Sequence, residues 1–200
     1  MEVGAATFCA AAVGLGEQAR LLTVSSGTDP APQSQDYEVV ALTGPGSLKP
    51  ALAGVRHLHL AAFPPLSEAE MSLMARAVAT ARSGRATLSI GLAGPDQIIQ
   101  HGRGRLTQEL AALRPDLLFL AESEGALLTA ALSDLCAVSV VSVESGGLRV
   151  FDRHVPGIHR LHGHAAELNA AFCAAYLEGA TPLEAAGRAV LLAQPAERNG

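Results

Sequence analysis

Short apolar runs alternate with longer stretches of helical spacing along most of the chain. Runs rich in Val, Leu and Ile predict strands at residues 20–24, 37–42, 57–62, 86–90, 116–120, 137–143 and 148–151. Apolar residues at helical spacing predict helices at residues 4–15, 68–83, 104–113, 125–132 and 182–194, besides an alanine-rich helix that ends at Gly179.

Two of these helices carry sequence signals that indicate where they begin. Ser67 precedes one of them, and Glu70 stands three positions later, which is the spacing of a capping box. Thr181 can cap the last helix in the same way, with Pro182 at its first position and Glu184 closing a second capping box. We therefore expect helices to start directly after Ser67 and Thr181.

The alternation of strands and helices defines the fold class. Strands separated by helices of this length form right-handed βαβ units, in which a mainly parallel sheet is covered by helices on both faces. The sequence therefore predicts a three-layer α/β/α protein. Alanine-rich helices suit close packing on such a sheet.

Composition narrows the classes of function. The chain has 200 residues and a net charge of −5, which argues against a nucleic-acid partner or an anionic membrane surface. Hydrophobic residues make up 49% of the chain and there is no Trp, so we expect an aliphatic core. No apolar run is long enough for a membrane span, no basic segment precedes a signal-like core, and the three cysteines form no CxxC pair. A cytoplasmic, soluble protein is expected.

Residues 158–184 carry the most informative motif. A polar turn containing Gly163 leads into the alanine-rich helix, which stops at Gly179. This layout resembles the anion-hole loop and catalytic helix of the ribokinase-like (PfkB) sugar and nucleoside kinases. When Gly163 is set on the first glycine of the family's loop, Gly179 falls on its helix-ending glycine without a gap. The resemblance implies an anion site formed by Gly163, His164 and Ala165, and ATP and Mg²⁺ as cofactors of an active member.

Two further segments resemble motifs of the same family. Residues 115–124 are similar to its strand and Asn-x-x-Glu motif, with Ala121 in place of the asparagine and Glu124 on the glutamate. The resemblance implies that Glu124 would organise the metal ion indirectly, through water. Residues 141–147 are similar to its Thr-x-Gly-x-x-Gly turn, which implies that Ser142 and Gly147 lie beside the nucleotide phosphates.

The amino-terminal residues resemble the family's opening motif in reduced form. Gly4, Thr7 and Asp29 stand where the family binds its sugar or nucleoside. The family's first strand would lie before Met1, and residues 29–37 are too few for its lid. The resemblance thus implies one ribokinase-like domain over residues 1–200, truncated at its start, with a loop at 26–36 in place of the lid and a frayed tail at 195–200.

One departure from the family bears on catalysis. The position of the catalytic aspartate holds Ala166, which cannot accept a proton. Glu167 is the nearest carboxylate, but one residue along a helix turns a side chain by about 100°. The leading hypothesis is therefore a catalytically impaired relative that binds a small polar ligand or acts through protein contacts. The alternative is an active ATP-dependent sugar or nucleoside kinase that uses Glu167 as its base or follows a substrate-assisted route, and a third hypothesis is a subunit or interaction module that forms a homodimer.

The histidines and one basic turn are the remaining candidates. His57 and His59 lie on the same face of a predicted strand, and four further histidines fall within residues 154–164. They lack the spacing of a zinc motif, so we expect hydrogen-bonded or exposed histidines rather than metal ligands. Residues 102–105, Gly-Arg-Gly-Arg, form a basic turn that could hold an anion, although a solvated loop is the expected role.

Overall fold

The protein is built around a five-stranded sheet, of which four strands are parallel. The structure is a computed structural model that describes residues 20–24, 38–42, 47–64, 67–128, 132–143, 147–152 and 165–193. The strand order is β3 (His57–Phe63), β4 (Thr87–Leu92), β5 (Leu117–Ala121), β6 (Val138–Val143) and β7 (Gly147–Asp152), with β7 antiparallel to β6. Separately, β1 (Arg20–Val24) and β2 (Glu38–Leu42) form a parallel pair. The prediction of a mainly parallel α/β fold is confirmed.

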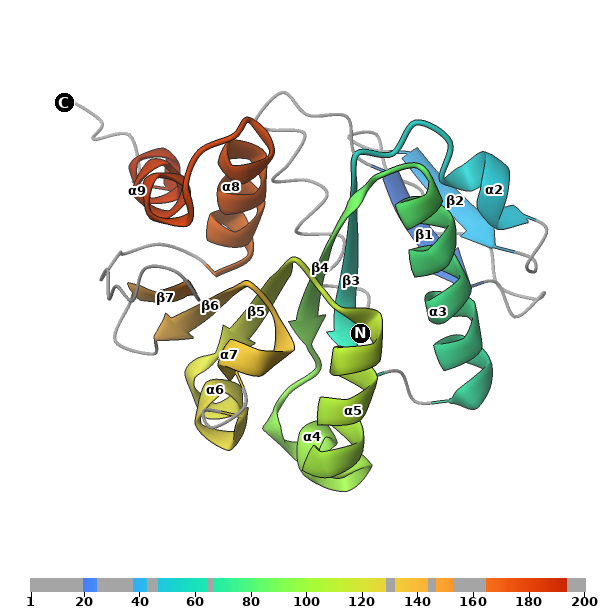
Figure 1. Cartoon of the computed structure of the whole chain (residues 1–200), viewed down its shortest axis with the longest axis horizontal. Coiled ribbons are helices and arrows are strands. Elements are labelled where there is room, and N and C mark those ends of the chain that lie inside the picture. The colour runs from blue at the N-terminus through green and yellow to red at the C-terminus, as the bar shows by residue number, and fades with distance from the viewer. Residues whose placement is uncertain are drawn as a thin grey trace, which may run out of the picture.

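Helices cover both faces of the five-stranded sheet (Figure 1). One face carries α2 (Leu48–Ala51), α3 (Glu68–Ser83), α4 (Pro95–His101), α5 (Arg103–Leu113), α6 (Glu122–Leu128) and α7 (Leu132–Leu135). The other face carries α8 (Ala165–Leu177) and α9 (Pro182–Ala193). The three layers follow from the alternation of strands and helices in the sequence.

The central strand β5 divides the interior into two apolar cores. Leu118 and Leu120 belong to the core that includes residues of α2 to α7, whereas Leu117 and Phe119 belong to the core that includes residues of α8 and α9. Successive side chains of a strand point to opposite faces, so one apolar run serves both cores. This is why β5 has no polar residue among its buried positions.

Both predicted capping boxes are present. The Ser67 backbone N–H donates to Glu70 Oε2 at 3.2 Å, and the Glu70 N–H donates to Ser67 Oγ at 3.2 Å. At α9 the Thr181 N–H donates to Glu184 Oε2 at 2.9 Å. This backbone hydrogen bond is the main reason why the pKa of Glu184 is lowered. The helices begin where the sequence indicates because these side chains satisfy the first free N–H groups.

The helix predicted at residues 125–132 is wrong in extent. The structure has one helix, α6, that begins at Glu122, and a separate short helix, α7. The sequence patterns do not predict α2 or α4. α6 begins at once after β5 because the carboxylate of Glu124 accepts the Ala121 N–H at 2.6 Å. α4 buries only Ile98, so its sequence has no helical stripe of apolar residues.

The end of α8 matches its sequence signal. Gly179 has φ +93°, and the Ala180 N–H bonds back to the Ala175 carbonyl at 3.2 Å. A left-handed residue of this kind closes a helix, and glycine adopts it without a steric cost. None of the helices in the described part of the chain is long and apolar enough to span a membrane.

Two helical glycines provide a matched test of the packing between α6 and the sheet. A Cβ added to Gly125 would lie 3.2 Å from Val141 Cγ1, whereas one added to Gly187 in α9 would meet nothing within 4 Å. Gly187→Ala should therefore raise the free energy of unfolding by about 0.5–1 kcal/mol, as helix propensity predicts. The free energy of unfolding of Gly125→Ala should be lower than that of Gly187→Ala by about 1 kcal/mol or more, because the added methyl group overpacks the core. Urea unfolding of both variants measures this, and an equal gain at both sites would contradict the packing described.

Candidate functional site

The carboxyl ends of the parallel strands bring together several of the residues selected from the sequence. Ala121, at the end of β5, pairs with Ser142 near the end of β6, and Ser142 pairs in turn with Leu148 of β7. Gly147 pairs with Val143, one step further along the same edge. Ser142 thus lies beside the start of α6, and the predicted position of Ser142 and Gly147 beside nucleotide phosphates stays a prediction.

Glu124 is the one buried carboxylate at this edge among the described residues. It lies in the first turn of α6 and is only 4% exposed. Burial raises the pKa of Glu124, and the backbone amides of Ala121 and Gly94 oppose that shift by hydrogen bonding to the carboxylate. Glu124 therefore ties the start of α6 to the loop after β4. Its predicted role near a metal ion stays a prediction.

The start of α8 lies at the same edge of the sheet. Leu177, at the end of α8, lines a pocket with Arg56 and Thr87 at the amino-terminal ends of β3 and β4. One to two turns earlier, Cys173 Sγ lies 3.6 Å from His57 Nε2. The helix therefore runs antiparallel to the strands, and Ala165, about 18 Å from Leu177 along the axis, is at the carboxyl end (Figure 1).

The structure places some of the predicted site residues and leaves others outside its description. Ala165, Ala166 and Glu167 form the first turn of α8, of which only the backbone is described. The predicted residues outside the described part are Gly4, Thr7, Asp29, Gly163 and His164. Whether the Glu167 carboxylate points toward the loop before α8 therefore stays a prediction.

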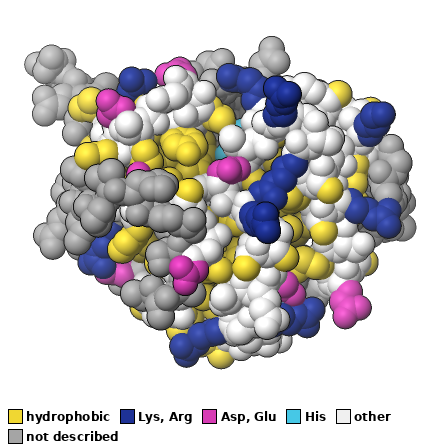
Figure 2. Space-filling view, viewed as in Figure 1, with side chains coloured by type: hydrophobic (Ala, Val, Ile, Leu, Met, Phe, Trp, Pro, Cys, Tyr) yellow, Lys and Arg dark blue, Asp and Glu magenta, His cyan; other side chains and the backbone are white. Residues whose placement is uncertain are grey.

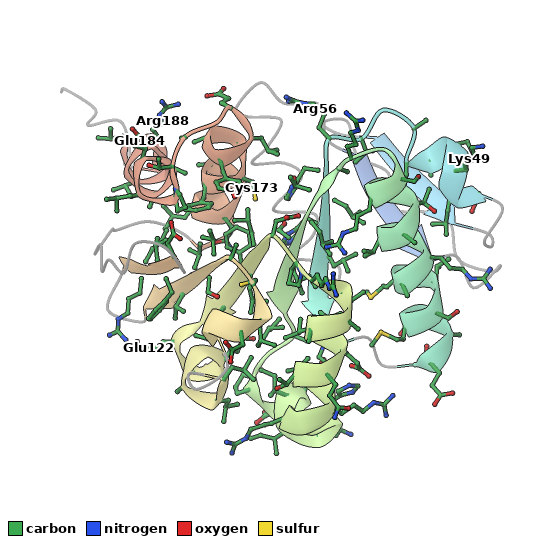
Figure 3. The ribbon with its side chains drawn as sticks, in the orientation of Figure 1. Lys49, Arg56, Glu122, Cys173, Glu184 and Arg188 are labelled. Carbon is green, nitrogen blue, oxygen red and sulfur yellow. The ribbon has the colours of Figure 1, made fainter. Side chains whose placement is uncertain are left out.

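A buried polar cluster of His57, His59, Thr87 and Ser89 lies beneath α8. His57 Nε2 and His59 Nδ1 each lie 2.7 Å from Ser89 Oγ, and His57 Nδ1 lies 2.7 Å from Thr87 Oγ1. Cys173 approaches the same imidazole from α8 and is labelled between the helix and the sheet in Figure 3. The sequence placed both histidines on one face, and that prediction is confirmed. The partners on β4 could not be found, because strand register is a property of the folded sheet.

The electrostatics of this cluster favour neutral groups. Burial lowers the pKa of His57 to about 4 and that of His59 to about 3, where the neighbouring His57 adds to the effect. Burial also raises the pKa of the Cys173 thiol to about 12. A neutral thiol is a poor nucleophile and a poor metal ligand. No set of three His, Cys, Asp or Glu residues within the described ranges is arranged to hold a metal ion.

Several similar solved structures are named as sugar or nucleoside kinases. The protein is similar to an adenosine kinase from Sinorhizobium meliloti, with TM-score 0.72 and 13% identity over 95% of this chain and 75% of that one. It is similar to a PfkB protein from Polaromonas sp. JS666, with TM-score 0.63 and 17% identity over 96% and 84% of the two chains. It is also similar to an Escherichia coli protein named as a ribokinase II, in complex with ATP and Mg²⁺, with TM-score 0.69 and 14% identity over 94% and 79%. No family model and no curated protein matches the sequence.

The chain has a ribokinase-like fold. At these identities the likeness concerns the fold and not the reaction. In open α/β sheets, ligands bind outside the carboxyl ends of the strands. The ribokinase-like sheet of this chain therefore indicates the edge where α6 and α8 begin, with Glu124 and Ser142, as the candidate functional site.

Removing the Glu124 carboxylate should destabilise this edge. Glu124→Ala leaves the N–H groups of Ala121 and Gly94 without their acceptor, which should cost about 1–3 kcal/mol of unfolding free energy. Glu122→Gln is the matched control on the same helix, since its ion pair with Arg149 at 3.2 Å is partly exposed and worth less than about 1 kcal/mol. Chemical denaturation compares the two, and equal losses would contradict the capping role.

The histidine cluster should make stability depend on pH. Unfolded imidazoles bind a proton near pH 6.5, but in the fold the pKa of His57 is about 4 and that of His59 about 3. Stability is therefore complete above about pH 7 and declines as the pH falls through 6.5 toward the folded values. Between about pH 7.5 and about pH 5.5 we expect a loss of about 1–3 kcal/mol.

Substitution of the two rings tests the source of that loss. His57→Asn with His59→Asn should flatten the dependence of unfolding free energy on pH, whatever its effect on absolute stability. Ile90→Val, which destabilises the neighbouring buried position of β4 without removing a titratable group, serves as the control and should keep the wild-type slope. An unchanged slope in the double variant would show that other groups cause the acid sensitivity.

Proposed function

We infer that the protein is a catalytically impaired relative of ATP-dependent sugar and nucleoside kinases, which binds a small polar ligand at the carboxyl edge of its sheet. The fold shared with kinases supports this proposal, as does the presence of ATP and Mg²⁺ in one of the similar structures. Ser142, Gly147 and Glu124 gather at the edge where ligands of α/β sheets bind.

The first turn of α8 is the observation that carries the proposal. The helix begins at Ala165, so Ala166 is its second residue. Free N–H groups at a helix start favour an anion such as a phosphate. Phosphoryl transfer to an alcohol also uses a carboxylate that accepts the hydroxyl proton, and alanine at that position supplies none. Free N–H groups for an anion without a carboxylate to accept the proton support ligand binding with little phosphoryl transfer.

Glu167 is the alternative base, and the geometry of α8 argues against it. The helix keeps an unbroken frame from Ala165 to its closing glycine, Gly179. A position one place further along a regular helix is rotated by about 100°, so position 167 lies on a different side of the helix axis from position 166. An active kinase with Glu167 as its base therefore requires a local change of helical register, whereas a substrate-assisted route does not.

A gain-of-function variant tests the proposal. Ala166→Asp should raise ATP-dependent turnover of a sugar or nucleoside panel by about 10²-fold or more over wild type, since a positioned base contributes about 10²–10⁴-fold. Ala165→Asp is the matched control, because it adds the same charge at the neighbouring position and should raise turnover little. Coupled detection of ADP release in the presence of Mg²⁺ measures both variants.

Two outcomes would contradict the proposal. If the wild-type protein already phosphorylates a substrate rapidly and Glu167→Ala abolishes this, the protein is an active kinase. If calorimetry finds that neither ATP·Mg²⁺ nor any sugar or nucleoside of the panel binds the wild-type protein, the carboxyl edge is not a ligand site. The function then lies in protein contacts.

A further inference from the structure

A pocket lies at the edge of the sheet opposite the candidate functional site. Its volume is about 370 Å³, and Arg56 and Thr87 place it at the amino-terminal ends of β3 and β4. The residues that line it are Leu52, Gly54, Val55, Arg56, Gly84, Arg85, Thr87 and Leu177. Since Leu177 ends α8, the whole helix, about 18 Å long, separates this pocket from the candidate site at the carboxyl edge.

The pocket combines positive charge with apolar walls. Two arginines, Arg56 and Arg85, line it, and the lining contains no aspartate or glutamate within the described part of the chain. The Asp116 carboxylate lies close by and accepts the Leu88 N–H at 2.7 Å. Figure 2 shows Lys and Arg side chains at the upper margin of the face in view, the end at which Figure 3 labels Arg56, and acidic side chains appear at that margin as well.

Arg85 closes α3 in a backbone conformation that glycine usually adopts. The Arg85 N–H donates to the Arg82 carbonyl at 2.9 Å, and the Ala86 N–H donates to the Ala81 carbonyl at 3.1 Å. These two bonds form a Schellman closure of α3, in which the left-handed residue is usually glycine. Here that residue is Arg85, with φ 65°, so glycine can replace this pocket residue without strain in the backbone.

The hydroxyl of Thr87 is oriented by the buried cluster. Thr87 Oγ1 lies 2.7 Å from His57 Nδ1 and 3.4 Å from the Arg56 carbonyl oxygen, and His57 Nε2 lies 2.7 Å from Ser89 Oγ. In the tautomer in which the ring donates to Thr87, the Thr87 proton is directed to the Arg56 carbonyl, and this weak bond can be exchanged for a ligand oxygen.

We propose that this pocket binds a small organic anion, whose phosphate or carboxylate meets Arg56, Arg85 and Thr87 and whose apolar body packs on the Leu and Val walls. Guanidinium groups bind planar or tetrahedral oxyanions through paired, charge-assisted hydrogen bonds. A pocket of this volume suits a ligand of low molecular mass. The site is separate from the carboxyl edge and does not depend on the function proposed there.

Phenyl phosphate is the probe, because it joins a dianionic head to an apolar ring. Calorimetry with the full-length protein should detect binding of phenyl phosphate, weaker binding of inorganic phosphate and none of phenol. Arg85→Gly should weaken the binding of phenyl phosphate by about tenfold or more, because it removes one charged donor. The same substitution should keep or raise the melting temperature, because glycine suits the left-handed position.

Two further variants keep the test decisive. Arg56→Gln should weaken binding independently and covers the case in which Arg85→Gly alters the fold. Arg103→Gln removes the same charge from the basic turn at residues 102–105, near the start of α5, and should leave binding unchanged. The absence of phenyl phosphate binding, equal binding by wild type and both pocket variants, or loss of binding in Arg103→Gln would each overturn the proposal.

Discussion

Residues 117–120 of β5 expose between 0% and 3% of their surface, and packing them requires helices on both faces of the sheet. Burial of each such side chain contributes about 1.5–3 kcal/mol. Because neighbouring residues point to opposite faces, the same strand fixes α3 to α7 against one face and α8 with α9 against the other. The positions of both sheet edges, and of every group at them, follow from this packing.

The face beneath α8 departs from the apolar pattern. Phe119 and Phe172 pack edge to face there with ring centroids 6.0 Å apart, and the His57–Ser89–His59 cluster lies beside them. Buried polar groups are tolerated when they satisfy one another, and this cluster does so while both rings stay neutral. It supports the middle of α8 without offering an accessible nucleophile or a metal site among the residues described.

The two ends of α8 lie at opposite edges of the sheet, and different side chains gather at each edge. Its start lies at the carboxyl edge, where the Glu124 carboxylate caps α6 and where Ala166 occupies the position that the family resemblance sets on an aspartate. Its end lies at the amino-terminal edge, where Arg56 and Arg85 are among the residues that line a pocket. The length of the helix, about 18 Å, sets the separation of the two regions.

Patterns local in sequence determined much of this protein. Apolar runs specified the strands of the main sheet to within two residues at either end, and the capping boxes at Ser67 and Thr181 specified two helix starts, because hydrogen bonds within one turn need no distant partner. The resemblance around Gly163 and Gly179 predicts the ribokinase-like fold, which the similar structures confirm. Side-chain geometry at the start of α8 does not follow from it, because that geometry depends on contacts outside the motif.

Only the tertiary structure decided which residues meet across the sheet. Register placed Ser89 between His57 and His59, joined Ala121 to Ser142, and brought Arg56 and Arg85 to one pocket from separate turns. For the same reason the sequence does not predict that α6 begins at Glu122, since the carboxylate of Glu124 caps the helix by accepting the N–H groups of both Ala121 and Gly94. Such contacts depend on packing between segments far apart in the chain, and a one-residue shift of strand register would remove them without altering any local pattern.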